Sequence, residues 1–153
     1  MDPKDKIAMV FDYLFGKGTS SALPLDGLEL TYSKRTGKIK TISLDGSLIA
    51  TFRPDGGVAL TVFGAELLLK NQDFRQNCVV ISKAAAKFVA AGRSVFTKHV
   101  VSCGDRVRPG ADVAVLDEEG KVVAVGKAVL SAKMMKSFKQ GVAVKVREGK
   151  REE

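Results

Sequence analysis

The chain has 153 residues, 45% of them hydrophobic and 27% charged, a composition typical of a globular protein and not of a disordered or fibrous one. No apolar run approaches the roughly 18 residues that a membrane-spanning helix needs, and no secretory or lipidation signal is present, so we expect a cytoplasmic protein with no membrane partner. Cys78 and Cys103 stand in no metal-ligand spacing, so we expect no metal and no cofactor, and inert thiols in preference to a disulfide.

The net charge of +8 is distributed unevenly along the chain. Residues 1–76 carry 10 Lys and Arg against 9 Asp and Glu, whereas residues 77–153 carry 15 against 8. Because Lys and Arg neutralise phosphates and release counterions, a local surplus of this kind favours a nucleic-acid partner. A basic surface without any such partner is the alternative that composition alone leaves open.

The first half of the chain predicts a helix followed by a strand meander. Ile7, Val10, Phe11 and Leu14 recur at helical spacing, which predicts an amphipathic helix over 4–15 with Asp2 as its cap. Residues 19–26 form a polar connection. Strands are expected over 28–32, 39–43, 48–52 and 58–63, and a short helix or an extended segment over 64–69. Asp45-Gly46 is a strong signal for a two-residue hairpin turn.

The polar segment 70–77 contains no proline and no long flexible run. We place a domain boundary there, which divides the chain into domains 1–74 and 75–153 and predicts a short, packed junction.

The second half predicts a strand over 79–81 and then a helix over 83–91, with Ser82 as its N-cap and Gly92 as its stop. Two valine-rich runs flank the polar turn 117–120, as in a β-hairpin. A short helical or turn segment is expected over 132–140, then an alternating strand through Val142, Val144 and Val146. Residues 148–153 are expected to be a frayed charged tail. The fold class is α+β.

The second half resembles a PUA domain, a small RNA-binding β pseudo-barrel. The matching pieces are 88–92, 95–96, 104–107, 113–117, 125–128, 131 and 141–144. The resemblance implies a PUA-type pseudo-barrel that follows a small mixed α/β N-terminal domain, with structured RNA as the ligand.

The first half resembles the domain that precedes the PUA domain in archaeal tRNA-guanine transglycosylases, the enzymes that insert the archaeosine precursor base into tRNA. Its most particular pieces are SKRTGKI at 33–39 and RPDG at 53–56. The chain therefore resembles the C-terminal RNA-binding half of such an enzyme, standing as a separate polypeptide. The family's catalytic barrel, with its two aspartates and a zinc site of three cysteines and a histidine, has no counterpart in a chain with two cysteines and one histidine.

No other catalytic motif is present either, neither a phosphate-binding loop, a nucleophile elbow nor a zinc-binding HExxH pair. His99 and Cys103 are close in sequence, but on a strand they would lie roughly 13 Å apart, too far to form a nucleophile pair. We expect no catalytic residues, and thus no enzyme activity by this chain alone.

The candidate RNA-binding residues lie on the 83–91 helix, on the loop after it and on the last strand, which together form the RNA groove of PUA domains. They are Lys83, Lys87, Gly92, Arg93, Ser94, Phe96, Lys98, His99, Lys145 and Arg147. Each lysine alone has a solvated surface charge as its equal alternative. Phe96, next to Val95, is more often a core residue than a base-stacking one. Lys34, Arg35, Lys38 and Lys40 either extend the RNA footprint or belong to a solvated hairpin.

These observations favour a non-catalytic tRNA-binding protein that partners a separate transglycosylase catalytic chain. The rival hypothesis is a stand-alone PUA adaptor that acts in translation or binds ribosome-associated RNA.

Overall fold

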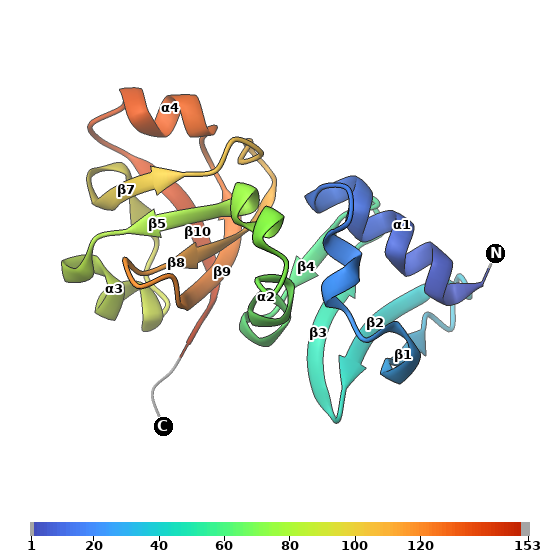
Figure 1. The fold of residues 1–153 in the computed structure, drawn as a ribbon. Helices are drawn as coiled ribbons and strands as arrows, with labels where there is room; N and C mark the ends of the chain where they lie inside the picture. Colours follow the sequence, from blue (N-terminus) through green and yellow to red (C-terminus); the bar gives the residue numbers. More distant parts are fainter. Residues whose placement is uncertain (1, 151–153) are drawn as a thin grey trace. The chain divides into compact units, whose positions relative to one another are not determined.

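A computed structural model describes residues 2–150 and divides the chain into two compact units, 1–74 (unit 1) and 75–153 (unit 2) (Figure 1). Each unit combines helices with one β-sheet, which confirms the predicted α+β class. None of the described helices has the length and apolar character to cross a membrane.

Unit 1 begins with helix α1 (Pro3–Phe15), as predicted. The side chain of Asp2 accepts a hydrogen bond from the backbone N–H of Lys4 at 2.9 Å and caps the helix. The apolar stripe of α1 is buried: Phe11 is fully enclosed and lies edge-on to Phe52, with 6.2 Å between the ring centroids. The predicted polar connection that follows contains two short 3₁₀ helices, η1 (Thr19–Ala22) and η2 (Leu25–Gly27).

The sheet of unit 1 is an antiparallel meander in the order β1-β2-β3-β4. Its strands are β1 (Glu29–Tyr32), β2 (Ile39–Leu44), β3 (Ser47–Phe52) and β4 (Val58–Leu60). Helix α1 covers one face of this sheet (Figure 1). Asp45 and Gly46 both have positive φ, 49° and 80°, as a two-residue hairpin turn requires, so the predicted hairpin is confirmed.

The strand predicted over 58–63 is wrong in its second half. Strand β4 ends at Leu60, and helix α2 (Val62–Leu68) begins two residues later. The Thr61 hydroxyl accepts a hydrogen bond from the backbone N–H of Gly64 at 3.0 Å, and this cap starts the helix inside an apolar run that alternation alone assigned to a strand. Gly64 is required there, because a Cβ would overlap the carbonyl oxygen of Ile49.

The predicted polar junction contains a further 3₁₀ helix, η3 (Gln72–Asn77). Its one aromatic residue, Phe74, is fully buried and packs edge-on against Phe15 of α1, with 5.6 Å between the ring centroids. Unit 1 is thus tied together by aromatic contacts between its first helix and its last residue.

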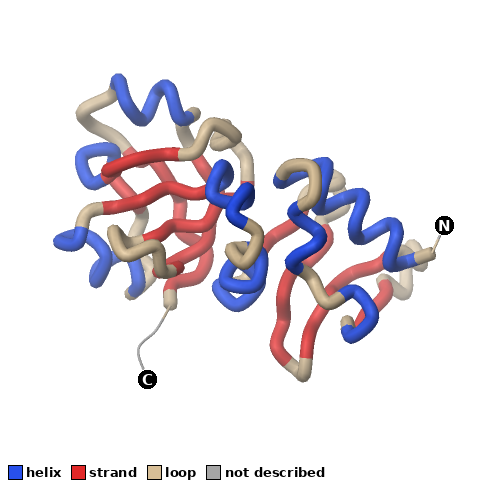
Figure 2. Tube along the Cα trace, in the orientation of Figure 1, coloured by secondary structure: helices blue, strands red, loops and turns tan. Residues whose placement is uncertain are grey.

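Unit 2 is built on a six-stranded sheet in the order β6-β10-β9-β8-β5-β7, which curls around the core of the unit (Figure 2). Its elements are β5 (Cys78–Ile81), α3 (Lys83–Ala90), β6 (Val95–Phe96), η4 (Thr97–His99), β7 (Val100–Cys103), β8 (Asp112–Leu116), β9 (Val122–Ala128), α4 (Ala132–Ser137) and β10 (Val142–Gly149). The predicted β8–β9 hairpin and the short helix α4 are confirmed. Strand β7 and the parallel pairing of β5 with β8 were not foreseen.

The predicted frayed tail is wrong for its described part. Glu148 and Gly149 belong to β10 and pair with Val125 and Ala124 of β9, and the N–H of Lys150 donates to the carbonyl oxygen of Val123 at 2.8 Å. A register shift between Val146 and Glu148 lets the strand continue past the regular alternation. The rest of that predicted tail, 151–153, lies outside the described residues.

Candidate nucleic-acid interface

Helix α3 presents a cationic side to solvent. Ala85 and Val89 are four residues apart and buried in the core of unit 2, so they mark the inward side of the helix. Lys83 and Lys87 have the same spacing on the opposite side, and both are exposed. The structure therefore brings these two predicted residues together on one face.

The start of α3 differs from the prediction in one respect. Ser82 occupies the N-cap position with an extended backbone, but its side chain makes no capping hydrogen bond, and its buried hydroxyl has no partner within residues 2–150. A carboxylate oxygen of Glu118, from the β8–β9 turn, accepts a hydrogen bond from the N–H of Lys83 at 3.2 Å instead. The negative charge stabilises the positive end of the helix dipole in place of the serine.

The end of α3 is a Schellman turn at Gly92. The N–H of Gly92 donates to the carbonyl oxygen of Val89 at 2.9 Å, and the N–H of Arg93 donates to that of Phe88 at 3.2 Å. Gly92 has a φ of 105°, which is strained for any residue with a Cβ. The turn projects Arg93 from the exposed end of the helix, and a Cβ on Gly92 would meet no atom within 4 Å.

The last strand meets this turn directly. A Cβ on Gly149, at the end of β10, would overlap the carbonyl oxygen of Ala90 and come within 3.0 Å of the backbone nitrogen of Gly92. The absence of a side chain at Gly149 lets the two backbones touch. The C-terminal turn of helix α3 and the end of β10 thus lie side by side.

Strand β10 adds a lysine pair to unit 2 that the sequence did not reveal. Lys145 is exposed, and its cross-strand partner in the antiparallel register is Lys127 of β9, also exposed. Directly opposite residues have Cβ atoms about 5 Å apart, where like charges repel. Lys127 also lies directly opposite Asp112 of β8, so this row carries two basic side chains and one acidic one, and the exposed lysine pair is a candidate phosphate contact.

Arg147 forms an ion pair with another residue of the protein. Its guanidinium forms a two-point ion pair with the carboxylate of Asp112, at 2.7 and 3.1 Å. The side chain of Asp112 is only 5% exposed, so this pair fastens β10 to β8 across the sheet. Arg147 remains a predicted RNA contact, but in this structure its guanidinium is paired with Asp112 and stabilises the sheet.

The remaining predicted residues follow the turn. Ser94 and His99 are half-buried and Lys98 is exposed. Val95 is fully buried, whereas Phe96, which pairs with Val142 of β10, is 45% exposed. The structure therefore leaves Phe96 open to solvent and puts its neighbour in the core.

Sequence reasoning missed a second exposed aromatic residue, Phe88, which is 59% exposed on α3. It follows Lys87 directly and its carbonyl oxygen accepts the Schellman hydrogen bond from Arg93. One residue advances a helix by about 100°, so Phe88 lies well off the buried direction marked by Val89, and helical spacing could have found it. Lys127 could not be found in this way, because its position depends on the strand register.

The thiols and the imidazole show no nucleophilic arrangement. His99 lies in η4 and not on the strand that carries Cys103, whose thiol donates to the carbonyl oxygen of Gly104 at 3.7 Å. Burial raises the pKa of Cys78 to about 12 and that of Cys103 to about 11, so both thiols stay protonated at neutral pH. Within residues 2–150, no three or more His, Cys, Asp or Glu side chains come together as metal ligands.

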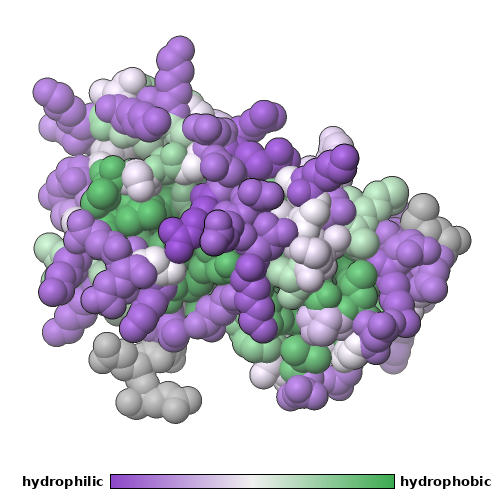
Figure 3. Space-filling model, in the orientation of Figure 1, coloured by the Kyte–Doolittle hydropathy of each residue, from purple (hydrophilic) through white to green (hydrophobic). Residues whose placement is uncertain are grey.

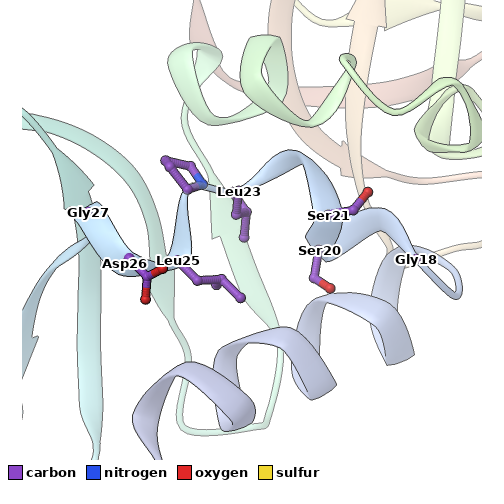
Figure 4. A pocket seen from close by; sticks show the side chains of 8 residues that line it. Gly18, Ser20, Ser21, Leu23, Leu25, Asp26 and Gly27 are labelled. Carbon is purple, nitrogen blue, oxygen red and sulfur yellow. The ribbon is translucent and has the colours of Figure 1, made fainter.

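Unit 1 carries a separate hollow of about 520 Å³, lined by residues 18–27. Figure 4 shows this lining as one continuous stretch that runs beside α1. Its one charged side chain, Asp26, forms an ion pair with Lys4 at 2.6 Å. The hollow offers no cation to a phosphate, whereas the four basic residues of the 34–40 region are all exposed.

Two family models together match most of the chain. A PUA domain model matches residues 77–150, and a model of the patch-forming domain C2 of tRNA-guanine transglycosylase matches residues 5–74. These two ranges correspond closely to the two structural units.

Individual relatives agree with the models. The tRNA-guanine(15) transglycosylase of Thermoplasma acidophilum is 39% identical over 147 residues, which is 95% of this chain and 23% of that enzyme. That of Methanothermobacter thermautotrophicus is 35% identical over 150 residues, 97% of this chain and again 23% of the enzyme. The chain thus spans about a quarter of the length of the relatives that it matches.

Solved structures support the fold. A hypothetical protein of Pyrococcus horikoshii superimposes with a TM-score of 0.76 at 23% identity, covering 98% of this chain and 91% of that one. A conserved PUA domain protein of Thermoplasma acidophilum gives a TM-score of 0.62 at 22% identity, with 100% and 93% covered. The chain consists of a C2 domain followed by a PUA domain and is homologous to the C-terminal part of archaeal tRNA-guanine(15) transglycosylases.

Proposed function

We propose that this chain binds structured RNA, with tRNA as its physiological ligand, and serves as the RNA-binding part of a tRNA-guanine transglycosylase. The observation that carries the proposal is the pair of exposed cations Lys87 and Arg93 beside the Schellman turn, which the end of β10 touches at Gly149; Lys145 adds an exposed cation further along β10. Its position in the unit that matches the PUA model supports RNA as the ligand.

The chemistry of the surface suits a folded RNA. Side chains cannot reach the bases in the deep, narrow major groove of an RNA helix, so a protein that binds one relies on its shape, phosphates and 2′-hydroxyls. Exposed lysines and the arginine meet phosphates, and the bare backbone at Gly92 allows a close approach. Phe88 and Phe96 offer half-exposed rings on which an unpaired base can stack.

In the proposed assembly, catalysis takes place on another chain. The relatives align with this protein only through their C-terminal quarter, and the thiols of Cys78 and Cys103 are protonated and inert. We propose that the base-exchange step is carried out by a transglycosylase catalytic domain on a separate polypeptide, to which this chain supplies affinity for tRNA.

Filter binding with a tRNA transcript tests RNA binding. Affinity should fall as salt rises, with a log–log slope of about −0.9 for each phosphate contact as a duplex-based guide. Lys87→Glu should weaken binding about tenfold or more, because attraction to a phosphate becomes repulsion. Lys17→Glu makes the same change in net charge on unit 1 and serves as the control. A flat salt response, or equal losses in both variants, would contradict the proposed surface.

A reconstitution experiment tests the catalytic partner. Labelled-guanine exchange into tRNA is measured with this chain, with a transglycosylase catalytic chain, and with both. Stimulation by the mixture alone supports the proposal, and exchange by this chain alone refutes it. RNA binding without stimulation would instead favour the rival role as a stand-alone PUA adaptor in translation.

A further inference from the structure

A second hollow, of about 540 Å³, lies in unit 2 between α4 with its following loop and the η4–β7 segment. We call it the α4–β7 hollow. The residues that define it here are Thr97, Lys98, Val101, Lys136, Phe138 and Lys139. It is distinct from the Schellman turn of α3, and Lys98 is its only residue among the predicted RNA contacts.

Two exposed apolar side chains line the hollow. Phe138 is 49% exposed and Val101 is 55% exposed, although both are large hydrophobic residues. Figure 3 shows this region as hydrophobic surface over β7, bordered by hydrophilic residues. Exposed apolar surface with a polar rim is typical of a binding site.

The charged side chains that line the hollow are all basic. Lys98, Lys136 and Lys139 line it, all three are exposed, and none of its described lining residues is acidic. Such a site complements an anion that also carries a flat apolar group. A nucleotide has both, a phosphate for the lysines and a base whose face stacks on an aromatic ring.

Thr97 lines the hollow, but its hydroxyl is enclosed in the protein. Its side chain is 5% exposed, and its hydroxyl has no hydrogen-bond partner among the described residues. Buried polar groups rarely stay unpaired in folded proteins. The N–H of Thr97 donates to the carbonyl oxygen of Gly141 at 2.9 Å, which joins this wall to the start of β10.

We propose that the α4–β7 hollow holds a single unpaired nucleotide of the bound RNA. The base stacks on Phe138 and the neighbouring phosphates lie against Lys98, Lys136 and Lys139. The volume falls within the roughly 300–1,000 Å³ of small-molecule sites, which suits one nucleotide. The inference rests on the proposed function and adds an unpaired nucleotide to the RNA features that the protein recognises.

The test compares three RNAs by fluorescence polarisation: a blunt hairpin, the same hairpin with four unpaired nucleotides at its 3′ end, and one with them at its 5′ end. An extension at one end should raise affinity for the parent protein. Phe138→Ala should reduce that gain about tenfold and leave binding of the blunt hairpin unchanged. Lys136→Glu should do the same, whereas Lys133→Glu on the same helix, outside the lining of the hollow, should keep the gain.

A second measurement uses the parent protein and so does not depend on the folding of any variant. Cys103 lines the hollow, while Cys78 is 2% exposed, so slow alkylation at Cys103 reports on the occupancy of the hollow. The hairpin with the extension that binds more tightly should protect Cys103, and the blunt hairpin should not.

Different results would refute the nucleotide site and the proposed function. If neither extension raises affinity, or the gain survives Phe138→Ala and Lys136→Glu, the nucleotide site is refuted while RNA binding stands. If the blunt hairpin and both extended hairpins all fail to bind in low salt, the proposed function itself is refuted.

Discussion

The Schellman turn ends helix α3 and leaves the surface at Gly92 free of side-chain atoms. Replacing Gly92 by alanine distinguishes the effects of these two roles on stability and on tRNA binding. A Cβ built at Gly92 meets no atom within 4 Å, so the substitution creates no clash. What remains is the strain of a φ of 105°, worth about 1–2 kcal/mol for an L residue. The lower conformational entropy of the unfolded chain offsets part of it, and we expect a net loss of about 1 kcal/mol.

The assay is a thermal melt followed by a tRNA titration. For a domain of the size of unit 2, a loss of 1 kcal/mol lowers Tm by about 4–8 °C. Gly110→Ala is the matched control, because Gly110 has a φ of 86° and open space around its Cα as well. Both variants should lose similar stability, but only Gly92→Ala should weaken tRNA binding, by about threefold or more, since its methyl group stands where a phosphate approaches.

Arg93→Glu should have the opposite balance of effects, with little change in stability and a large loss of tRNA binding. Arg93 is exposed, and substitutions at such sites change stability by about 0.5 kcal/mol or less. Its charge reversal should weaken tRNA binding more than tenfold. The reasoning is refuted if Gly92→Ala costs more than about 3 kcal/mol, or if Arg93→Glu unfolds the protein or binds tRNA as well as the parent.

Three further substitutions and titrations probe the rest of unit 2. Gly149→Ala should destabilise the protein by more than about 2 kcal/mol in urea melts, because its Cβ overlaps the carbonyl oxygen of Ala90; a change under 0.5 kcal/mol would contradict the close backbone approach. Arg147→Met should cost more stability than Arg147→Met costs in an Asp112→Asn background, since the first removes the two-point guanidinium partner of a shielded carboxylate; equal losses in the double-mutant cycle would contradict a stabilising ion pair. Alkylation of Cys103 should accelerate about tenfold per pH unit from pH 8 and level off near pH 11, because only the thiolate reacts and burial raises its pKa; a plateau near pH 9, as in urea-unfolded protein, would contradict this.

Local signals in the sequence were sufficient for the elements that depend on neighbours along the chain. The stripe through Phe11 predicted α1, Asp45-Gly46 predicted its hairpin, and Gly92 predicted the end of α3. In each case the interacting groups are within a few residues of one another, so spacing and turn chemistry determine the result.

The errors occurred where distant residues decide the local structure. Glu118 caps α3 in place of Ser82, and the carbonyl of Ile49 leaves room only for glycine at position 64 of α2. Arg147 stays a predicted RNA contact, but its pairing with Asp112 depends on the sheet order and was not foreseen. The Lys127–Lys145 pair likewise needs the register of β9 and β10, which alternation cannot supply.

Strand order also has a consequence for biosynthesis. Strand β10 is the last described element to leave the ribosome, yet it fills an interior place in the sheet, between β6 and β9. Until it is added, β6 lacks its strand partner among the described residues, and the close approach of Gly149 to Ala90 and Gly92 is missing. A nascent chain that lacks β10 therefore displays the lysines of α3 without the strand that completes the proposed RNA surface, so this surface forms only after β10 has been synthesised.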